Sequence, residues 1–161
     1  MISLDFLEKV ACFSCLNDDQ LKMVQEKAEI AEFARGEKIF THGSDATHVW
    51  IVLEGDVELR SEAPGDAQQT VDRAVSFMAE ANAFGWTCFV PPYRYQLSGY
   101  CTSRQCKLIK FDREDLKALF EKDAVIGLEV MSYLIGAVGQ QFEQLQDEIA
   151  KQRGYEIMSN W

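Results

Sequence analysis

Glycines that separate short runs of alternating apolar and polar residues restrict the fold of this sequence more than any other feature. Gly36, Gly43, Gly55 and Gly85 lie between or at the edges of such runs, which extend from about residue 29 to residue 112. Alternation with a period of two is typical of β-strands that have one buried face. Many short strands at nearly regular spacing predict a β-sandwich or a barrel-like roll.

The chain has 161 residues, which is the length of one domain with one core. We therefore expect a single domain over residues 1–161, with a helical entry at 1–27, a β-roll at 28–112 and C-terminal helices at 113–161. A polar segment at residues 62–68 is predicted to be the tip of a hairpin. The predicted strands are 29–34, 38–40, 48–54, 57–61, 70–78, 97–102 and 107–112.

Helices are predicted on both sides of the strands. Asn17 is followed three residues later by Gln20, a pattern typical of a capping box at the start of a helix. After the last predicted strand, residues 113–122 form a short amphipathic helix whose apolar side chains share one face.

The C-terminal segment contains an unbroken row of apolar residues at alternating spacings of three and four. This is the a/d pattern of a coiled coil, in a helix of about residues 124–153 that would be roughly 45 Å long. The row either packs on a second copy of the chain, forming a homodimer, or lies along the roll as core. Glycines at 127, 136 and 139 lower the stability of the helix, so a bend near Gly136 is also expected. Its members are Leu128, Met131, Ile135, Val138, Phe142, Leu145 and Ile149.

The charge of the chain disfavours polyanionic partners. Twenty-six acidic residues against sixteen basic ones give a net charge of −10, which argues against nucleic-acid binding and against an anionic membrane surface. The longest uninterrupted apolar run, residues 49–53, is too short to cross a bilayer, and the first residues do not resemble a secretory signal. Five cysteines without signs of an oxidising compartment indicate reduced thiols in a cytoplasmic protein.

Several motifs in order carry a resemblance to a known family. Residues 6–16 look like its helical entry, and residues 35–40 (RGEKIF), Gly43 and residues 49–59 (VWIVLEGDVEL) match its glycines and the strands between them. The chain thereby resembles the cyclic-nucleotide-binding domain family, the effector half of bacterial regulators such as the catabolite activator protein. The resemblance implies a mainly β fold, a double-stranded β-helix (a jelly-roll, cupin-like β-roll) flanked by N-terminal helices and a long C-terminal dimerisation helix.

The same resemblance implies a phosphate-binding cassette in residues 84–98. In the family, this segment begins Phe-Gly-Glu and ends on an Arg after a Pro. The Arg and backbone amides hold the cyclic phosphate, and the Glu holds the ribose hydroxyl. Here Trp86 stands where the Glu is expected, and Arg94 follows a proline pair one residue early. The ligand-binding residues that the resemblance implies are Phe84, Gly85, Trp86, Thr87, Arg94, Tyr95 and Gln96.

Two of these residues admit alternative interpretations. Arg94 either contacts an anionic ligand or forms an ordinary surface ion pair. Trp86 either stacks on the sugar or is a core aromatic residue beneath the loop. Loss of the Glu removes a charged hydrogen bond worth about 1.5–3 kcal/mol. The expected ligand is therefore a cyclic nucleotide (cAMP or cGMP) or another small anion.

The sequence predicts a ligand-sensing regulatory module that signals through its C-terminal helix to a partner protein. The alternative is a degenerate scaffold that binds proteins but no ligand. Sensing through a metal or redox change at Cys12 and Cys15 is a third interpretation, although structural cysteines fit this spacing better. We expect no enzymatic activity, because no catalytic motif is present, and no direct DNA binding, because no winged helix-turn-helix follows the long helix.

Overall fold

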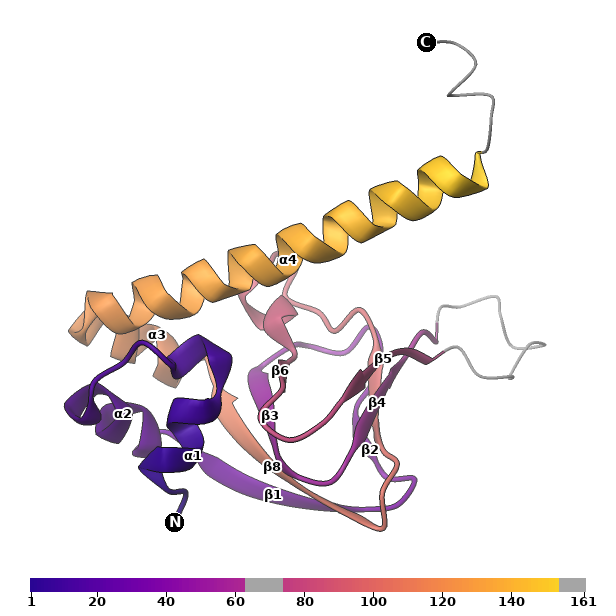
Figure 1. Cartoon of the computed structure of the whole chain (residues 1–161). Helices are drawn as coiled ribbons and strands as arrows, with labels where there is room; N and C mark the ends of the chain where they lie inside the picture. Colours follow the sequence, from indigo (N-terminus) through magenta and orange to yellow (C-terminus); the bar gives the residue numbers. More distant parts are fainter. Residues whose placement is uncertain (63–73, 154–161) are drawn as a thin grey trace, which may run out of the picture.

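Two four-stranded antiparallel sheets form the predicted β-roll in the computed structural model (Figure 1). Sheet 1 has the order β1 (Glu29–Ala34), β8 (Gln105–Asp112), β3 (His48–Glu54) and β6 (Ala83–Phe84). Sheet 2 has the order β2 (Lys38–Phe40), β7 (Ser98–Cys101), β4 (Val57–Arg60) and β5 (Ala74–Met78). The mainly β fold predicted from the sequence is confirmed. Strand β6 was not predicted, because two residues are too few to show alternation.

The structure describes residues 1–62 and 74–153. Most of the predicted hairpin tip (63–68), the first part of the predicted strand 70–78 and the segment 154–161 lie outside these ranges. Within them, the strand bounds agree with the predicted ones to within two residues, apart from the missing β6.

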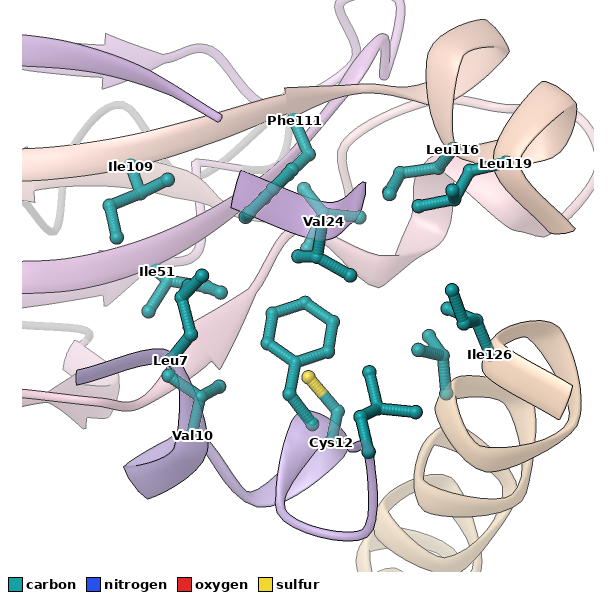
Figure 2. Packing of buried hydrophobic residues seen from close by; sticks show 14 of the residues in the cluster. Leu7, Val10, Cys12, Val24, Ile51, Ile109, Phe111, Leu116, Leu119 and Ile126 are labelled. Atoms are coloured by element: carbon teal, nitrogen blue, oxygen red, sulfur yellow. The ribbon is translucent and has the colours of Figure 1, made fainter. Parts of the chain in front are cut away.

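The middle of strand β3 in sheet 1 is buried on both faces. Trp50 and Val52 on β3 pack against the interior of the roll, where they meet Val57 and Leu59 of β4. The neighbouring residue Ile51 points to the other face and packs against helical residues, as do Ile109 and Phe111 of β8 (Figure 2). Burial on both faces explains why the run 49–53 is continuously apolar rather than alternating.

The helices cover the outer face of sheet 1. They are α1 (Leu4–Lys9), the 3₁₀ helix η1 (Ala11–Phe13), α2 (Asp18–Gln25), α3 (Arg113–Lys122) and α4 (Ala124–Gln152). The capping box of α2 is present as predicted: Gln20 N–H donates to Asn17 Oδ1 at 2.9 Å, and Asn17 N–H donates to Gln20 Oε1 at 3.0 Å. Aspartates cap the two C-terminal helices, Asp112 for α3 and Asp123 for α4.

Two faces of α4 have different surroundings. Ile126, Val130 and Leu134 are buried against the core. The apolar row with a/d spacing lies on another face, and most of it is exposed, with Ile135 at 73% and Phe142 at 60%. The interpretation of this row as core is therefore wrong for this chain. The helix also continues unbroken past Gly136, and Figure 1 shows its C-terminal half projecting beyond the roll.

The two apolar faces together make α4 long and apolar enough to meet the length and composition criterion for a membrane-spanning helix. Polar residues interrupt α4, so it contains no long uninterrupted apolar run. Core helices of soluble domains meet the same criterion. One face of α4 packs on α3 and η1, but only 22% of its most apolar stretch is buried, because the a/d row is exposed.

Candidate functional site: the cassette between β6 and β7

The predicted cassette leaves β6 through a turn that requires glycine. Gly85 has a φ of +83°. A Cβ there would lie 3.0 Å from the carbonyl oxygen of His48 and 3.1 Å from Cδ1 of Trp50. Both the left-handed backbone and the close approach to β3 exclude a side chain. The segment continues as the 3₁₀ helix η2 (Trp86–Phe89) and a cis Pro91–Pro92 bond before it reaches Arg94.

The loop before β3 pairs with the end of the cassette. Tyr95 N–H donates to the carbonyl of Ser44 at 3.0 Å, and Gly43 N–H donates to the carbonyl of Tyr95 at 2.8 Å. Ala46 N–H donates to the carbonyl of Tyr93 at 2.8 Å. These bonds hold the backbone on both sides of Arg94 against residues 43–46. The backbone N–H of Tyr95 therefore already donates a hydrogen bond within the protein and is not available to a ligand.

The side chain of Tyr95 turns into the core. It is 4% exposed, and its ring stacks on Phe40 with centroids 4.0 Å apart. Its hydroxyl donates to the carbonyl of His48 at 3.0 Å and accepts from Trp50 Nε1 at 3.2 Å. Burial raises the pKa of this phenol. Tyr95 therefore fixes the cassette to β3 and remains a neutral, fully bonded group at physiological pH.

Arg94 points outward. Its Nη1 donates to the carbonyl oxygen of Gly43 at 2.8 Å and lies 3.7 Å from Oδ1 of Asp45. The Arg94 side chain is 54% exposed and that of Asp45 is 80% exposed. An ion pair as exposed as this contributes at most about 1 kcal/mol. The guanidinium is therefore accessible to an anion that replaces Asp45.

Trp86 connects the cassette to the C-terminal helices. It is half-buried, and its ring lies 6.1 Å from that of Tyr133 on α4 and 6.5 Å from that of Phe89. Phe89 in turn lies 6.1 Å from Phe120 of α3. Aromatic contacts thus run from η2 to both helices, so a displacement of the cassette would reach α4 directly.

The seven predicted site residues occupy one segment but three environments. Phe84 and Tyr95 are buried in the roll, Trp86 faces α4, and Arg94 and Gln96 are exposed. Gly85 forms the turn, and Thr87 lies half-buried in η2. Asp45 and Tyr133, the partners of Arg94 and Trp86, are not among the residues predicted from the sequence. The only signal for Asp45 was its place two residues after Gly43, and the signal for Tyr133 was its helical position three residues after Val130.

The five cysteines are free thiols, and four of them are buried. Cys12 belongs to the core, where burial raises its pKa to about 12, whereas Cys15 is exposed. Within residues 1–62 and 74–153, no three metal-binding side chains lie close enough together to hold an ion.

A β-roll with a glycine-turned cassette that contacts a long C-terminal helix defines a class of regulatory sensor domains. The chain belongs to the cyclic nucleotide-binding domain family, whose family model matches residues 30–123. The resemblance predicted from the motifs is thereby confirmed.

Known relatives cover nearly all of this chain. A crystal structure described as a cyclic nucleotide-binding protein from Geobacter metallireducens GS-15 is 26% identical, with a TM-score of 0.72, and the match covers 88% of this chain and 99% of that one. The catabolite activator protein of Thermus thermophilus has the same fold at 17% identity and a TM-score of 0.71, over 84% of this chain and 62% of that one.

Among curated proteins, a protein of Rhodopseudomonas palustris described as a potassium channel protein is 23% identical over 154 residues. The match covers 96% of this chain but only 35% of that protein, so this chain spans about a third of the relative's length.

Proposed function

We propose that this domain is a ligand-sensing regulatory module that binds a small anion at Arg94 and transmits binding to α4. The contact between Trp86 and Tyr133, with ring centroids 6.1 Å apart, carries the proposal. Trp86 directly follows the turn at Gly85, so a cassette that closes on an anion moves this indole against α4. Ligand binding would then shift the population between two positions of the helix.

Arg94 is suited to the anion because its present partners are weak competitors. A neutral carbonyl and an exposed carboxylate hold it. An oxyanion can offer two parallel charge-assisted hydrogen bonds to the guanidinium, a stronger arrangement than a single ion pair at 3.7 Å.

The cyclic nucleotides cAMP and cGMP are candidate ligands with reduced affinity. An indole offers one N–H donor and no acceptor, so Trp86 cannot replace a carboxylate that binds a ribose hydroxyl. The missing charged hydrogen bond lowers the expected affinity about ten- to a hundredfold relative to a cassette with Glu. Other small anions do not require this contact.

A non-binding scaffold is the second candidate, and the hydrogen bonds of Tyr95 favour it. Its amide donates to Ser44, and its hydroxyl is bonded to Trp50 and His48. A cassette in this state needs no ligand to satisfy its polar groups. The domain would then act only through surfaces such as α4.

We further propose that the domain acts as a cytoplasmic homodimer without a catalytic role of its own. The exposed row on α4 has the a/d spacing of a coiled coil and projects beyond the roll. A second copy of the same helix would cover it with matched apolar side chains. A partner protein would then bind the paired helices in one of their two positions and not in the other.

Isothermal titration of cAMP, cGMP and phosphate into protein that has been unfolded, dialysed and refolded tests the ligand proposal. Saturable heat that Arg94→Ala weakens at least about tenfold would support it. Arg94→Lys, which keeps the charge but loses the two-pronged geometry, should retain part of the binding. Hydrogen exchange along α4 should change on binding in the wild type and less in Trp86→Ala. Absence of heat up to millimolar ligand would favour the scaffold.

A further inference from the structure

A second group of polar side chains gathers on sheet 2, around a carboxylate of the chain itself. Glu62 lies two residues past the end of β4 and is the last described residue before β5. Its carboxylate receives donors from two other strands. Lys38 belongs to β2, and Ser98 and Tyr100 belong to β7.

Both oxygens of this carboxylate are bound. Ser98 Oγ donates to Oε2 of Glu62 at 2.8 Å, and Lys38 Nζ lies 3.2 Å from the same oxygen. The hydroxyl of Tyr100 donates to Oε1. These bonds, that of Tyr100 first, lower the pKa of Glu62, so the bound group is an anion.

The hydroxyl of Ser98 is oriented before any anion arrives. Ser98 is 0% exposed, and its Oγ accepts the backbone N–H of His42 at 2.8 Å. This bond occupies a lone pair, so the hydroxyl proton is free to point toward the carboxylate. A buried hydroxyl that lacks a hydrogen-bond acceptor lowers the stability of the protein. The proton of Ser98 Oγ therefore requires an acceptor oxygen at the position that Glu62 now fills.

Two cationic side chains lie near the same place. Lys38 Nζ lies 5.3 Å from the centroid of the Tyr100 ring, and Arg60 Cζ lies 4.3 Å from it, while Arg60 Nη2 also donates to Oε2 of Glu58 at 3.0 Å. The side chains of Lys38 and Glu62 are 37% and 34% exposed, so solvent reaches the cluster. A cation, two hydroxyl donors and solvent access match the requirements of an oxyanion site.

We propose that Lys38, Ser98 and Tyr100 form a binding site for a small oxyanion of the phosphate type, and that Glu62 occupies this site in the absence of the ligand. The carboxylate and a phosphate present oxygen acceptors of the same kind to the same donors. An incoming anion must displace Glu62, and this competition sets the affinity of the site. The site shares Ser98, the last residue of the cassette segment 84–98, but none of the seven ligand-binding residues predicted there. It does not depend on the function proposed for Arg94.

The test removes the internal competitor. Glu62→Ala should bind sodium phosphate saturably in calorimetry and gain thermal stability from it, relative to sodium chloride of equal ionic strength. Its affinity should exceed that of the wild type by at least about tenfold, since a charged hydrogen-bonding group no longer competes. Glu62→Gln keeps the shape of the side chain and should show an intermediate affinity. This variant serves if the alanine variant is unstable.

Two further variants locate the bound phosphate. Lys38→Ala added to Glu62→Ala should weaken phosphate binding at least about tenfold. Arg94→Ala added to Glu62→Ala removes any phosphate bound at the cassette and should leave the Lys38-dependent phosphate binding unchanged. Equal phosphate affinity of Glu62→Ala, Glu62→Gln and the wild type would overturn the proposal, as would insensitivity to Lys38→Ala. Loss of all phosphate binding on Arg94→Ala would instead assign the phosphate to the cassette.

Discussion

The indole N–H of Trp50 donates to the hydroxyl oxygen of Tyr95 across 3.2 Å. Trp50 belongs to the central strand β3, and Tyr95 follows the arginine of the cassette by one residue. The bond joins residues 45 positions apart and is buried. The cassette is therefore attached to a buried strand of sheet 1 at the residue beside Arg94.

Tyr95→Phe should destabilise the domain by about 1–3 kcal/mol, because the indole of Trp50 and the carbonyl of His48 lose their partner inside the protein. Urea unfolding measures the change. Tyr93→Phe is the matched control: Tyr93 is 39% exposed and its hydroxyl has no hydrogen-bond partner in the described part of the chain. Equal stability of the two variants would contradict a structural role for the Tyr95 hydroxyl.

Two glycines of α4 should respond oppositely to the same substitution. A Cβ on Gly127 would lie 2.9 Å from Cβ of Phe120, whereas one on Gly136 would meet nothing within 4 Å. Gly136→Ala should stabilise the domain by about 0.5–1 kcal/mol through helix propensity. Gly127→Ala should destabilise it by about 1–3 kcal/mol, because α3 and α4 must separate. Stabilisation by both substitutions in thermal unfolding would show that α3 does not approach α4 so closely.

Ile135→Glu should dissociate the proposed dimer. The side chain is 73% exposed in the isolated chain, so the substitution should leave the fold of the protomer intact. A charge inside a coiled-coil seam should weaken association at least about a hundredfold. Gln140→Glu adds the same charge on the same helix but outside the a/d row and should have little effect. Sedimentation equilibrium distinguishes the two, and a monomeric wild type would refute the dimer.

The direction of the two helices in the dimer can be tested with charges. In a parallel pair, Glu148 at a g position lies opposite Arg153 at the next e position of the partner helix. Glu148→Arg alone should weaken the dimer a few-fold, and adding Arg153→Glu should restore it. An antiparallel pair does not bring these positions together, so the double variant would then show no recovery.

Acidification should destabilise the domain through His48. Burial lowers the pKa of this imidazole and outweighs the carboxylate of Asp112, whose Oδ2 is 3.9 Å from Nε2. The unfolded chain therefore binds a proton more readily than the native one, so stability falls as the pH drops below about 6.5. His48→Asn should flatten the pH dependence of urea unfolding between pH 7 and 5. If the pH dependence of stability is the same in His48→Asn as in the wild type, other titrating groups cause it.

Features that depend on neighbours in the chain were predictable from the sequence. The start of α2 follows from Asn17 and Gln20, whose side chains bond to each other's backbone across one helical turn. The predicted bounds of 113–122 coincide with α3 because its apolar period is local. The motif match that identified the family has the same origin, since glycine turns and strand alternation are properties of short segments.

The cassette side chains were not predictable in this way. Arg94, Tyr95 and Gln96 are consecutive, yet one is fixed in the core and two are exposed. Which one turns inward depends on Phe40 and Trp50, more than 40 residues away in the chain. The contacts of the Glu62 carboxylate could not be predicted from the sequence either. Lys38 and Ser98 come close to Glu62 only because β2, β7 and β4 are neighbours in sheet 2.

The long helix α4 has one property that the sequence predicts and one that depends on tertiary contacts. Periodicity alone predicts a helix at about residues 124–153 with an apolar row of a/d spacing along one face, and the helix spans 124–152. That Ile126, Val130 and Leu134 pack on the core, rather than that row, follows from contacts in the folded chain and not from the periodicity. Helical periodicity shows which residues share a face. Which face packs on the core depends on the shape of η1 and α3, the two elements that α4 contacts, and the periodicity of α4 contains no information about them.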